Sequence, residues 1–317
     1  MHHKLRSCLI LLISSGIIFS IAILVISKSL PDSLNSEDYD IFANGTETEI
    51  IEFLEKSESK VNINSYYSLI RRDGYEILEL IFQKYNLDPD YGFKNQGGTP
   101  LLFAAKNFKP KAVEILIDYG AKVNYLDPYG VTPLIATSYT TLENENSESF
   151  EITKLLVYAG ADINVVSEFG QTAIEGALFS NDIRRVKFLV DNNGDINHLS
   201  PTGANYMFFC DYLECYEFFL SKGFDINSTD NAGSSIFQVA HYSSIPLSLT
   251  KQLLNWGADI CHKDDLGDSV LNYIERRGTG PHDKNENPDF YFKMLSENRQ
   301  SVAYKYLENE YNLNCQE

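Results

Sequence analysis

Positive charge is scarce in this sequence of 317 residues, which has 26 lysines and arginines against 44 aspartates and glutamates. The formal net charge of -18 argues against a nucleic-acid partner, because binding to a phosphate backbone needs neutralisation by lysine and arginine. A surface this acidic suits solvation, a basic partner, or both. The length is enough to bury a sizeable core, in one elongated domain or two compact ones.

Motifs for catalysis and cofactor binding are also missing. The sequence has no GxSxG elbow and no phosphate-binding glycine loop of the P-loop or dinucleotide type. Beyond the N-terminus, the histidines lie far apart with no recurring acid or nucleophile beside them: His198, His241, His262 and His282. His241 could act as a base, but a partly exposed packing role is favoured. We therefore predict no enzyme, no cofactor and no metal site.

Cysteine is sparse, with five in the chain. Cys8 opens an apolar run, and the other four could form two disulfides in any of three pairings: Cys210, Cys215, Cys261 and Cys315. Without a CxxC or a paired Cys/His spacing, metal binding is a weak alternative. Cys210 and Cys215 stand among phenylalanines and tyrosines, so buried free thiols are the default expectation for them.

The N-terminus carries a long uncharged run from Cys8 to Ser27. As a helix, Leu9 to Ile26 would span about 27 Å, close to the hydrocarbon thickness of a bilayer. The run is long for a cleaved signal peptide, and only Ser27-Lys28-Ser29 resembles a cleavage site. An uncleaved signal-anchor is therefore favoured, and a cleaved signal peptide is the alternative. No cysteine follows the run closely, which argues against a lipoprotein anchor.

Charges on either side of this run predict its orientation. Lys4 and Arg6 precede it, and four acidic residues follow it: Asp32, Glu37, Asp38 and Asp40. The positive-inside tendency keeps such an N-terminus in the cytoplasm and sends the remainder across the membrane. We predict a cytoplasmic basic segment (1–8), a transmembrane segment (9–27), a linker (28–35), and the bulk of the chain in the periplasm or otherwise outside the cytoplasm.

Glycines recur at a fixed spacing beyond residue 35. One series has intervals of 40, 34, 29 and 34 residues: Gly120, Gly160, Gly194, Gly223 and Gly257. A second series, at the turns between units, has intervals of 40, 33, 30 and 34: Gly130, Gly170, Gly203, Gly233 and Gly267. The shared period of about 33 residues, with one insertion and one shortened unit, indicates a repeat protein.

Each repeat has the signals of two helices and a turn. Thr99 is placed to cap a short helix that begins at Pro100, and a second apolar helix follows a brief turn. Gly120 supplies the left-handed residue that ends this second helix. An Asp-x-x-Gly turn, Asp127 to Gly130, leads into the next unit. Neither helix buries its apolar face alone, so the units must stack.

The pattern resembles the ankyrin repeat, whose TPLHxAA and LLxxGAxxN signatures return here as TPLLFAA with LIDYGAKVN and TPLIAT with LLVYAGADIN. The resemblance covers about eight units over residues 36–295, with divergent units at 49–64 and 76–90. It implies an all-α solenoid of helix-turn-helix units with β-turn fingers. The predicted ankyrin-repeat domain is 36–300, and 301–317 is a C-terminal tail with a capping helix at Tyr304–Asn314.

The sequence departs from the family pattern in several places. The histidine of TPLH is absent, and near its position stand Leu102, Ile135, Glu175, Phe208 and Phe237. Asn205-Tyr206 replaces Thr-Pro in one unit, whose first helix should start irregularly. Polar insertions are expected between helices at Thr137–Phe150 and at Arg277–Asp289. Disorder or simple tolerance is favoured for both, and a functional loop is the alternative.

The resemblance implies a protein-binding surface at the turn tips and the exposed face of the first helices. The candidate partner-binding residues at the tips are Tyr125, Asp127, Tyr129, Glu168, Phe169, Asp230, Asn231, Asp264 and Asp265. Aromatic anchors among acidic groups suit a protein with a basic and apolar patch. The alternative is that these acids only shape the turns. Trp256 belongs either to the core, which is favoured, or to the binding surface.

From these features we predict a membrane-tethered ankyrin protein outside the cytoplasm that captures and neutralises a protein partner. The resemblance extends to bacterial envelope proteins, some of which are immunity proteins against secreted antibacterial effectors such as phospholipases. The partner would then be a secreted toxin or lipase effector, with no nucleic acid bound and the membrane contacted only through the N-terminal helix. The alternative is a scaffold or assembly factor for a resident envelope complex.

Overall fold

The computed structural model describes residues 41–56, 63–85, 88–90, 98–138, 146–242, 245–275 and 301–315. The predicted segments 1–8, 9–27 and 28–35 and the insertion 277–289 lie outside these ranges. In the described ranges, no helix combines the length and hydrophobicity needed to cross a bilayer. The described residues fall into two compact units, one ending at His198 and the other beginning at Leu199. We call them the N-terminal and C-terminal units.

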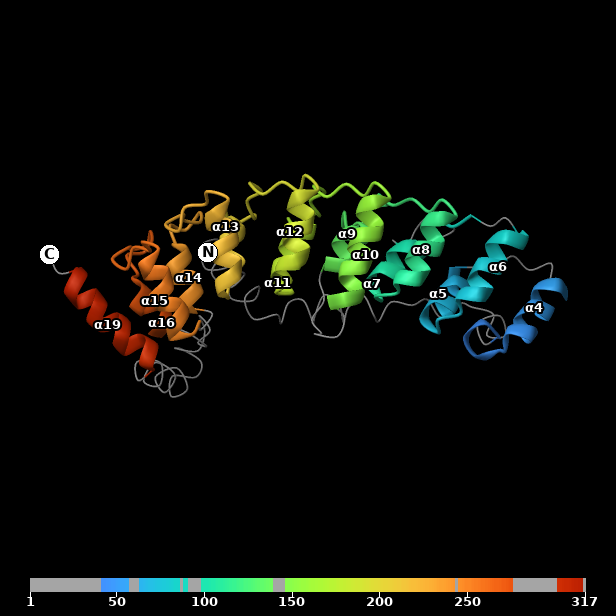
Figure 1. The fold of residues 1–317 in the computed structure, drawn as a ribbon, viewed down its shortest axis with the longest axis horizontal. Coiled ribbons are helices and arrows are strands. Elements are labelled where there is room, and N and C mark those ends of the chain that lie inside the picture. Colours follow the sequence, from blue (N-terminus) through green and yellow to red (C-terminus); the bar gives the residue numbers. More distant parts are fainter. Residues whose placement is uncertain are drawn as a thin grey trace. The chain divides into compact units, whose positions relative to one another are not determined.

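The N-terminal unit is a stack of helix pairs (Figure 1). After α4 (Glu47–Lys56) come the pairs α5 (Ile63–Arg71) with α6 (Tyr75–Tyr85), α7 (Pro100–Lys106) with α8 (Pro110–Asp118), α9 (Pro133–Ser138) with α10 (Asn146–Tyr158), and α11 (Ala173–Phe179) with α12 (Ile183–Asp191). The first helices contact one another in order, α5 with α7, α7 with α9 and α9 with α11. The second helices form another layer, in which α8 contacts both α6 and α10. The predicted all-α repeat architecture is confirmed for this unit.

The C-terminal unit continues the pattern with one irregular pair. It contains η2 (Tyr206–Phe209), α13 (Leu213–Ser221), α14 (Ile236–Tyr242), α15 (Leu247–Asn255), α16 (Val270–Glu275) and α19 (Val302–Asn314). The predicted irregular start is confirmed, because η2 is a 3-10 helix capped by the Asn205 side chain, whose Oδ1 accepts from the Met207 amide at 3.0 Å. Where the capping helix was predicted, the structure has α19, which contacts α15 and α16.

The first helices start as the sequence predicts. The Thr99 hydroxyl accepts from the Leu102 amide at 3.2 Å, and Thr132 and Thr172 make the same bond at 3.1 Å in the next two pairs. Ala104 and Ala105 of α7 are fully buried, and their small side chains let neighbouring helices approach. The capping threonine and the apolar face therefore place each first helix inside the stack.

The predicted ends of the second helices are confirmed with one correction. Gly120, Gly160, Gly223 and Gly257 adopt φ between 85° and 89°, the left-handed region in which glycine carries no steric penalty. Gly194 is not the equivalent residue, because Asn193 takes the left-handed position with φ of 71°. Asparagine tolerates this conformation better than most residues, which explains how the adjacent Asn-Gly pair misaligned the repeat by one position.

One asparagine side chain in each of three repeats bonds to the backbone of the following repeat. The Asn164 side chain donates to the Asn193 carbonyl at 3.1 Å and accepts from the Asp195 amide at 2.7 Å. Asn124 bonds in the same way to Gly160 and Asp162, and Asn227 to Gly257 and Asp259. Each asparagine thereby uses both its donor and its acceptor to fix the register between repeats.

The four cysteines in the described ranges form two disulfides, Cys210–Cys215 and Cys261–Cys315. The expectation of buried free thiols at Cys210 and Cys215 is therefore wrong. The 3-10 helix ends before Cys210 and α13 begins at Leu213, so the tight turn returns Cys215 to a Cα–Cα distance of 5.5 Å from Cys210. Sequence spacing carried no information about this local turn.

The insertion predicted at Thr137–Phe150 is shorter than expected, because α9 extends to Ser138 and α10 begins at Asn146. Arg185 of α12 is fully buried beside both ends. Its guanidinium donates to the Thr137 carbonyl at 2.8 Å, to the Ser138 carbonyl at 3.2 Å, and to the Ser149 hydroxyl. Burial lowers the pKa of Arg185 to about 10, so the group stays cationic at neutral pH. A buried cation thus satisfies the carbonyl end of α9.

We expect Asn164→Ala to lower the free energy of unfolding by about 1 kcal/mol, because two backbone groups of the next repeat lose their partner. Asn107→Ala is the control, since the Asn107 side chain donates to the carbonyl of Phe103, four residues earlier in the same repeat, at 2.8 Å. Urea unfolding of both variants measures the difference. Equal losses would contradict a role for Asn164 in joining repeats.

Candidate partner-binding surface

The turns between repeats are shaped by aspartates. The Asp127 carboxylate accepts from the Tyr129 and Val131 amides, both at 2.8 Å. Asp230 and Asp264 accept from the amides two and four residues later in the same way, at 2.8 to 2.9 Å. Three of the predicted acidic site residues therefore have one carboxylate oxygen committed to the turn. Asp264 is also buried, and its second oxygen accepts from the Tyr273 hydroxyl at 3.0 Å.

Successive turns within a unit are bonded to one another. The Glu168 amide donates to the Tyr129 carbonyl at 2.9 Å in the N-terminal unit, and the Asp265 amide donates to the Ala232 carbonyl at 3.1 Å in the C-terminal unit. Gly130 has φ of 73°, and a Cβ there would stand 3.3 Å from the Glu168 nitrogen, so the close approach requires glycine. Equivalent side chains of neighbouring turns are consequently brought into line.

In the N-terminal unit this alignment produces an exposed apolar surface. Tyr129 and Phe169 occupy equivalent positions, are 46% and 63% exposed, and stack with ring centroids 5.8 Å apart. Leu126 and Val166, also equivalent to each other, are 53% and 44% exposed. We call Leu126, Tyr129, Val166 and Phe169 the apolar tip surface. Large exposed apolar side chains that adjoin one another are typical of interaction sites.

The other predicted site residues are less alike. Tyr125 is half-buried, Glu168 is exposed beside Phe169, and Asn231 and Asp265 are exposed on the turns of the C-terminal unit. In that unit the positions equivalent to the apolar tip surface hold Leu199, Thr202, Thr229, Ala232, Lys263 and Leu266. These positions are mixed in the C-terminal unit, where Leu199 and Leu266 are 55% and 81% exposed, and no aromatic side chain stands at them. Leu126 and Val166 were missed by the sequence reasoning, although both directly precede the residue that shapes the turn.

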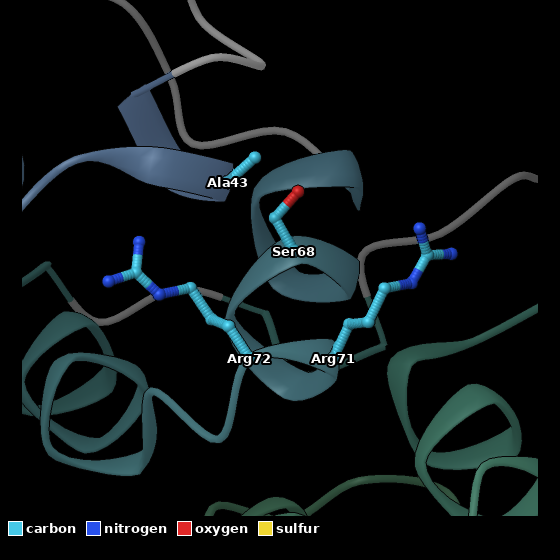
Figure 2. Close-up of a pocket in the computed structure, with 4 residues that line it drawn as sticks. All are labelled: Ala43, Ser68, Arg71 and Arg72. Atoms are coloured by element: carbon cyan, nitrogen blue, oxygen red, sulfur yellow. The ribbon is translucent and has the colours of Figure 1, made fainter.

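A small hollow near the beginning of the N-terminal unit is lined by Ala43, Ser68, Arg71 and Arg72. Figure 2 shows the two guanidinium groups pointing away from each other on opposite sides of α5. Arg72 donates to the Phe42 and Gly45 carbonyls at 3.3 and 2.8 Å, and the Arg71 guanidinium lies 5.7 Å from the centre of the Phe103 ring. Because the two cations do not converge, the hollow lacks the geometry of an anion site.

His241, the histidine singled out as a possible base, has a structural role. The described ranges contain no group of three or more His, Cys, Asp or Glu side chains placed to hold a metal ion. His241 is buried rather than partly exposed, and its ring nitrogens lie 2.7 Å from the Phe237 carbonyl and 3.0 Å from the Thr250 hydroxyl. These two contacts show that His241 packs α14 against α15, the packing role that the sequence favoured. Trp256 is half-buried at the end of α15.

Glu175 and Gln238 take the place of the family histidine. Gln238 rather than Phe237 is the equivalent residue, because it stands three positions after Ser235, as Glu175 stands three positions after Thr172. The Gln238 amide oxygen accepts from the Ser235 amide at 2.8 Å, and its nitrogen donates to the Asp268 carbonyl at 2.6 Å. Glu175 lies in the first turn of α11 and is buried, with an exposed fraction of 8%. Burial raises the pKa of Glu175 to about 7, against a weaker lowering by the Thr172 amide.

A stack of helix pairs with aligned turns and an exposed tip surface defines the class of helical repeat proteins that bind through surfaces rather than pockets. Ankyrin-repeat models match residues 65–165 and 142–230, which together span 65–230, or 166 of 317 residues. This chain belongs to the ankyrin repeat family. Proteins of this fold are typically binding scaffolds without catalytic activity.

The relatives differ widely in size and source. The chain is 25% identical over 184 residues to an ankyrin repeat and KH domain-containing protein of Caenorhabditis briggsae, covering 58% of this chain and 7% of that one. It is 29% identical over 87 residues to a putative ankyrin repeat protein of Borreliella burgdorferi, covering 27% and 36%. The chain spans less than a third of the length of the first curated relatives it matches.

Solved structures agree on the fold. The ankyrin repeat domain of human ASB11 matches with a TM-score of 0.58 at 18% identity, covering 76% of this chain and 95% of that one. The ankyrin repeat domain of Bcl-3 matches with a TM-score of 0.53 at 21% identity, covering 68% and 95%. At these identities the likeness describes the fold alone.

We expect Glu175→Gln to stabilise the protein by about 2 kcal/mol at pH 8, where the buried carboxylate is ionised. In the wild type the raised pKa adds stability as pH falls from about 7 towards the unfolded-state value, because the folded state then binds the extra proton. As the pH is lowered from 8 to 5, the free energy of unfolding of the wild type, measured with urea, should rise relative to that of the variant. Parallel pH profiles for the two proteins would rule out this account of Glu175.

Proposed function

We propose that the protein is a membrane-tethered binder outside the cytoplasm, which captures and neutralises a protein partner through its turn tips. The observation that carries this proposal is the apolar tip surface, whose four side chains are exposed at matched positions of two consecutive turns. The turns themselves are built from backbone atoms and the Asp127 carboxylate, so these side chains are available for contact. Aromatic side chains of this kind dominate the free energy of binding at interfaces.

The chemistry of the surface describes its partner. Glu168 is exposed beside Phe169, and the whole chain carries a net charge of -18. A partner with an apolar patch edged by lysine or arginine would bury the rings and meet opposite charge at the rim. Long-range attraction between the two would raise the association rate and would weaken with salt.

Two features support a location outside the cytoplasm. The uncharged run of residues 9–27 has the length of a membrane span, and Lys4 and Arg6 precede it. The disulfides Cys210–Cys215 and Cys261–Cys315 belong to the chemistry of oxidising compartments such as the bacterial periplasm. In such a compartment a stoichiometric binder without catalytic groups would suit an immunity protein against a secreted effector, for which a phospholipase is one candidate.

The decisive experiment is a pull-down with the full chain in mild detergent against envelope and secreted extracts. We expect one partner whose activity, if it is a secreted hydrolase, falls to zero at equal stoichiometry with the bait. A resident membrane protein captured instead would favour the scaffold function over neutralisation. Activity that persists with a saturating amount of bound protein would contradict neutralisation.

For the same partner, the double variant Tyr129→Ala with Phe169→Ala should weaken binding by about 2–4 kcal/mol, or about 30- to 1000-fold in Kd. Tyr158→Ala is the control, because Tyr158 is 74% exposed at the end of α10 and its ring contacts Phe188 rather than the apolar tip surface. Titration calorimetry measures the three affinities. A Kd unchanged by the double variant would remove the apolar tip surface from the interface.

A further inference from the structure

The last complete repeat departs from its predecessors at the position of the asparagine that bonds to the next repeat. Residues 257–261 read GADIC where residues 160–164 read GADIN, so Cys261 stands at the position of the register-fixing Asn164. The backbone is held alike at both sites, because the Cys261 amide donates to the Asp259 carboxylate at 2.8 Å and the Asn164 amide to the Asp162 carboxylate at 2.9 Å. Only the bond made by the side chain has changed.

That side chain leads to the C-terminal helix. Cys261 is bonded to Cys315, which directly follows α19 and lies 54 positions later in the chain. Asn124, Asn164 and Asn227 each reach forward to the following repeat by hydrogen bonds, whereas Cys261 reaches forward to α19 by a covalent bond. At the end of the C-terminal unit, the disulfide therefore replaces the asparagine hydrogen bonds that connect one repeat to the next.

The two halves of α19 are secured differently. In its first half Tyr304 and Leu307 are buried, and the Tyr304 hydroxyl donates to the Glu275 carboxylate of α16 at 2.7 Å. From Glu308 onward every described residue is exposed or half-buried, and Leu313 is 79% exposed. Burial thus secures the first half, and the bond to Cys315 is what fixes the second.

We propose that Cys261–Cys315 is a redox-sensitive end cap, which holds the second half of α19 against the last repeat only under oxidising conditions. A dithiol reductant would supply two electrons and two protons, convert Cys261 and Cys315 to thiols, and itself become a disulfide. Opening the 54-residue loop restores chain entropy. The second half of α19 then separates from the repeat, while Tyr304 and Leu307 retain the first half. This inference is independent of the identity of the partner.

The second disulfide provides an internal comparison. Cys210 and Cys215 are 2% and 0% exposed, whereas Cys261 and Cys315 are half-buried. Because a reductant must reach the sulfur atoms, we expect the Cys261–Cys315 bond to open first. Cys210–Cys215 also closes a separation of only five residues, so its opening frees little chain.

Hydrogen exchange of the full chain in detergent, with and without dithiothreitol, tests the proposal. In the oxidised protein we expect amides of residues 308–314 to be protected, and reduction should accelerate their exchange by about tenfold or more. Amides of α14 and α15 should keep their protection, which separates release of the helix end from unfolding of the unit. Mass spectrometry of an alkylated but unreduced digest should show the peptide of Cys261 joined to the peptide of Cys315.

Two variants complete the test. The double variant Cys261→Ala with Cys315→Ala should exchange rapidly at 308–314 with or without dithiothreitol, while Cys210→Ala with Cys215→Ala should keep the redox response. Protection at 308–314 that survives reduction in the wild type would overturn the proposal. So would free Cys261 and Cys315 thiols in protein purified without reductant, or a redox response that disappears with Cys210 and Cys215 instead.

Discussion

Within each unit, the arrangement of this protein depends on asparagine side chains that bond one repeat to the next. Asn124, Asn164 and Asn227 each reach a carbonyl and an amide of the following repeat. Helices packed only through apolar faces could slide, because hydrophobic contact has no preferred direction. The paired hydrogen bonds remove that freedom. Turns that lie in register, and side chains that line up along them, follow from this constraint.

Two charged side chains, Arg185 and Glu175, lie in the interior of the N-terminal unit. Arg185 is buried against the carbonyl end of α9, and Glu175 is buried in the first turn of α11. The two sites differ in how well their charge is compensated. Arg185 meets several oxygen acceptors and stays ionised, whereas burial of Glu175 moves its pKa towards neutrality. Such charges cost stability wherever compensation is partial, and they restrict how the helices can pack.

Much of the fold was predictable because its signals are local. Thr99 and Pro100 mark a helix start, Gly120 marks a helix end, and the recurrence of both reveals the repeat. The errors came from positions where the sequence is ambiguous. Asn193 took the left-handed position expected for Gly194, and Cys210 and Cys215, expected as buried free thiols, are bonded across a tight turn. The pairing of Cys261 with Cys315 could not be chosen from the sequence, because it depends on where α19 packs.

The candidate surface was predictable in place and less so in composition. The tips were found from the turn motif, yet Asp127 and Asp264 proved to be parts of the turn itself, since an Asp-x-x-Gly sequence does not reveal how a carboxylate is used. Leu126 and Val166 were overlooked because single apolar residues in loops carry no periodic signal. Their alignment exists only once the repeats are stacked.

In each turn, the residues that fix the backbone are different from the residues that project outward, and this separation affects which substitutions the turn tolerates. In the first of these turns the conformation depends on Asp127 and Gly130, while Leu126 and Tyr129 project outward and contribute little to folding. Substitutions at the outward positions are therefore nearly neutral for stability, and they accumulate without disturbing the helices beneath. The outward side chains can therefore be exchanged, and with them the chemistry of the surface, while the architecture stays fixed.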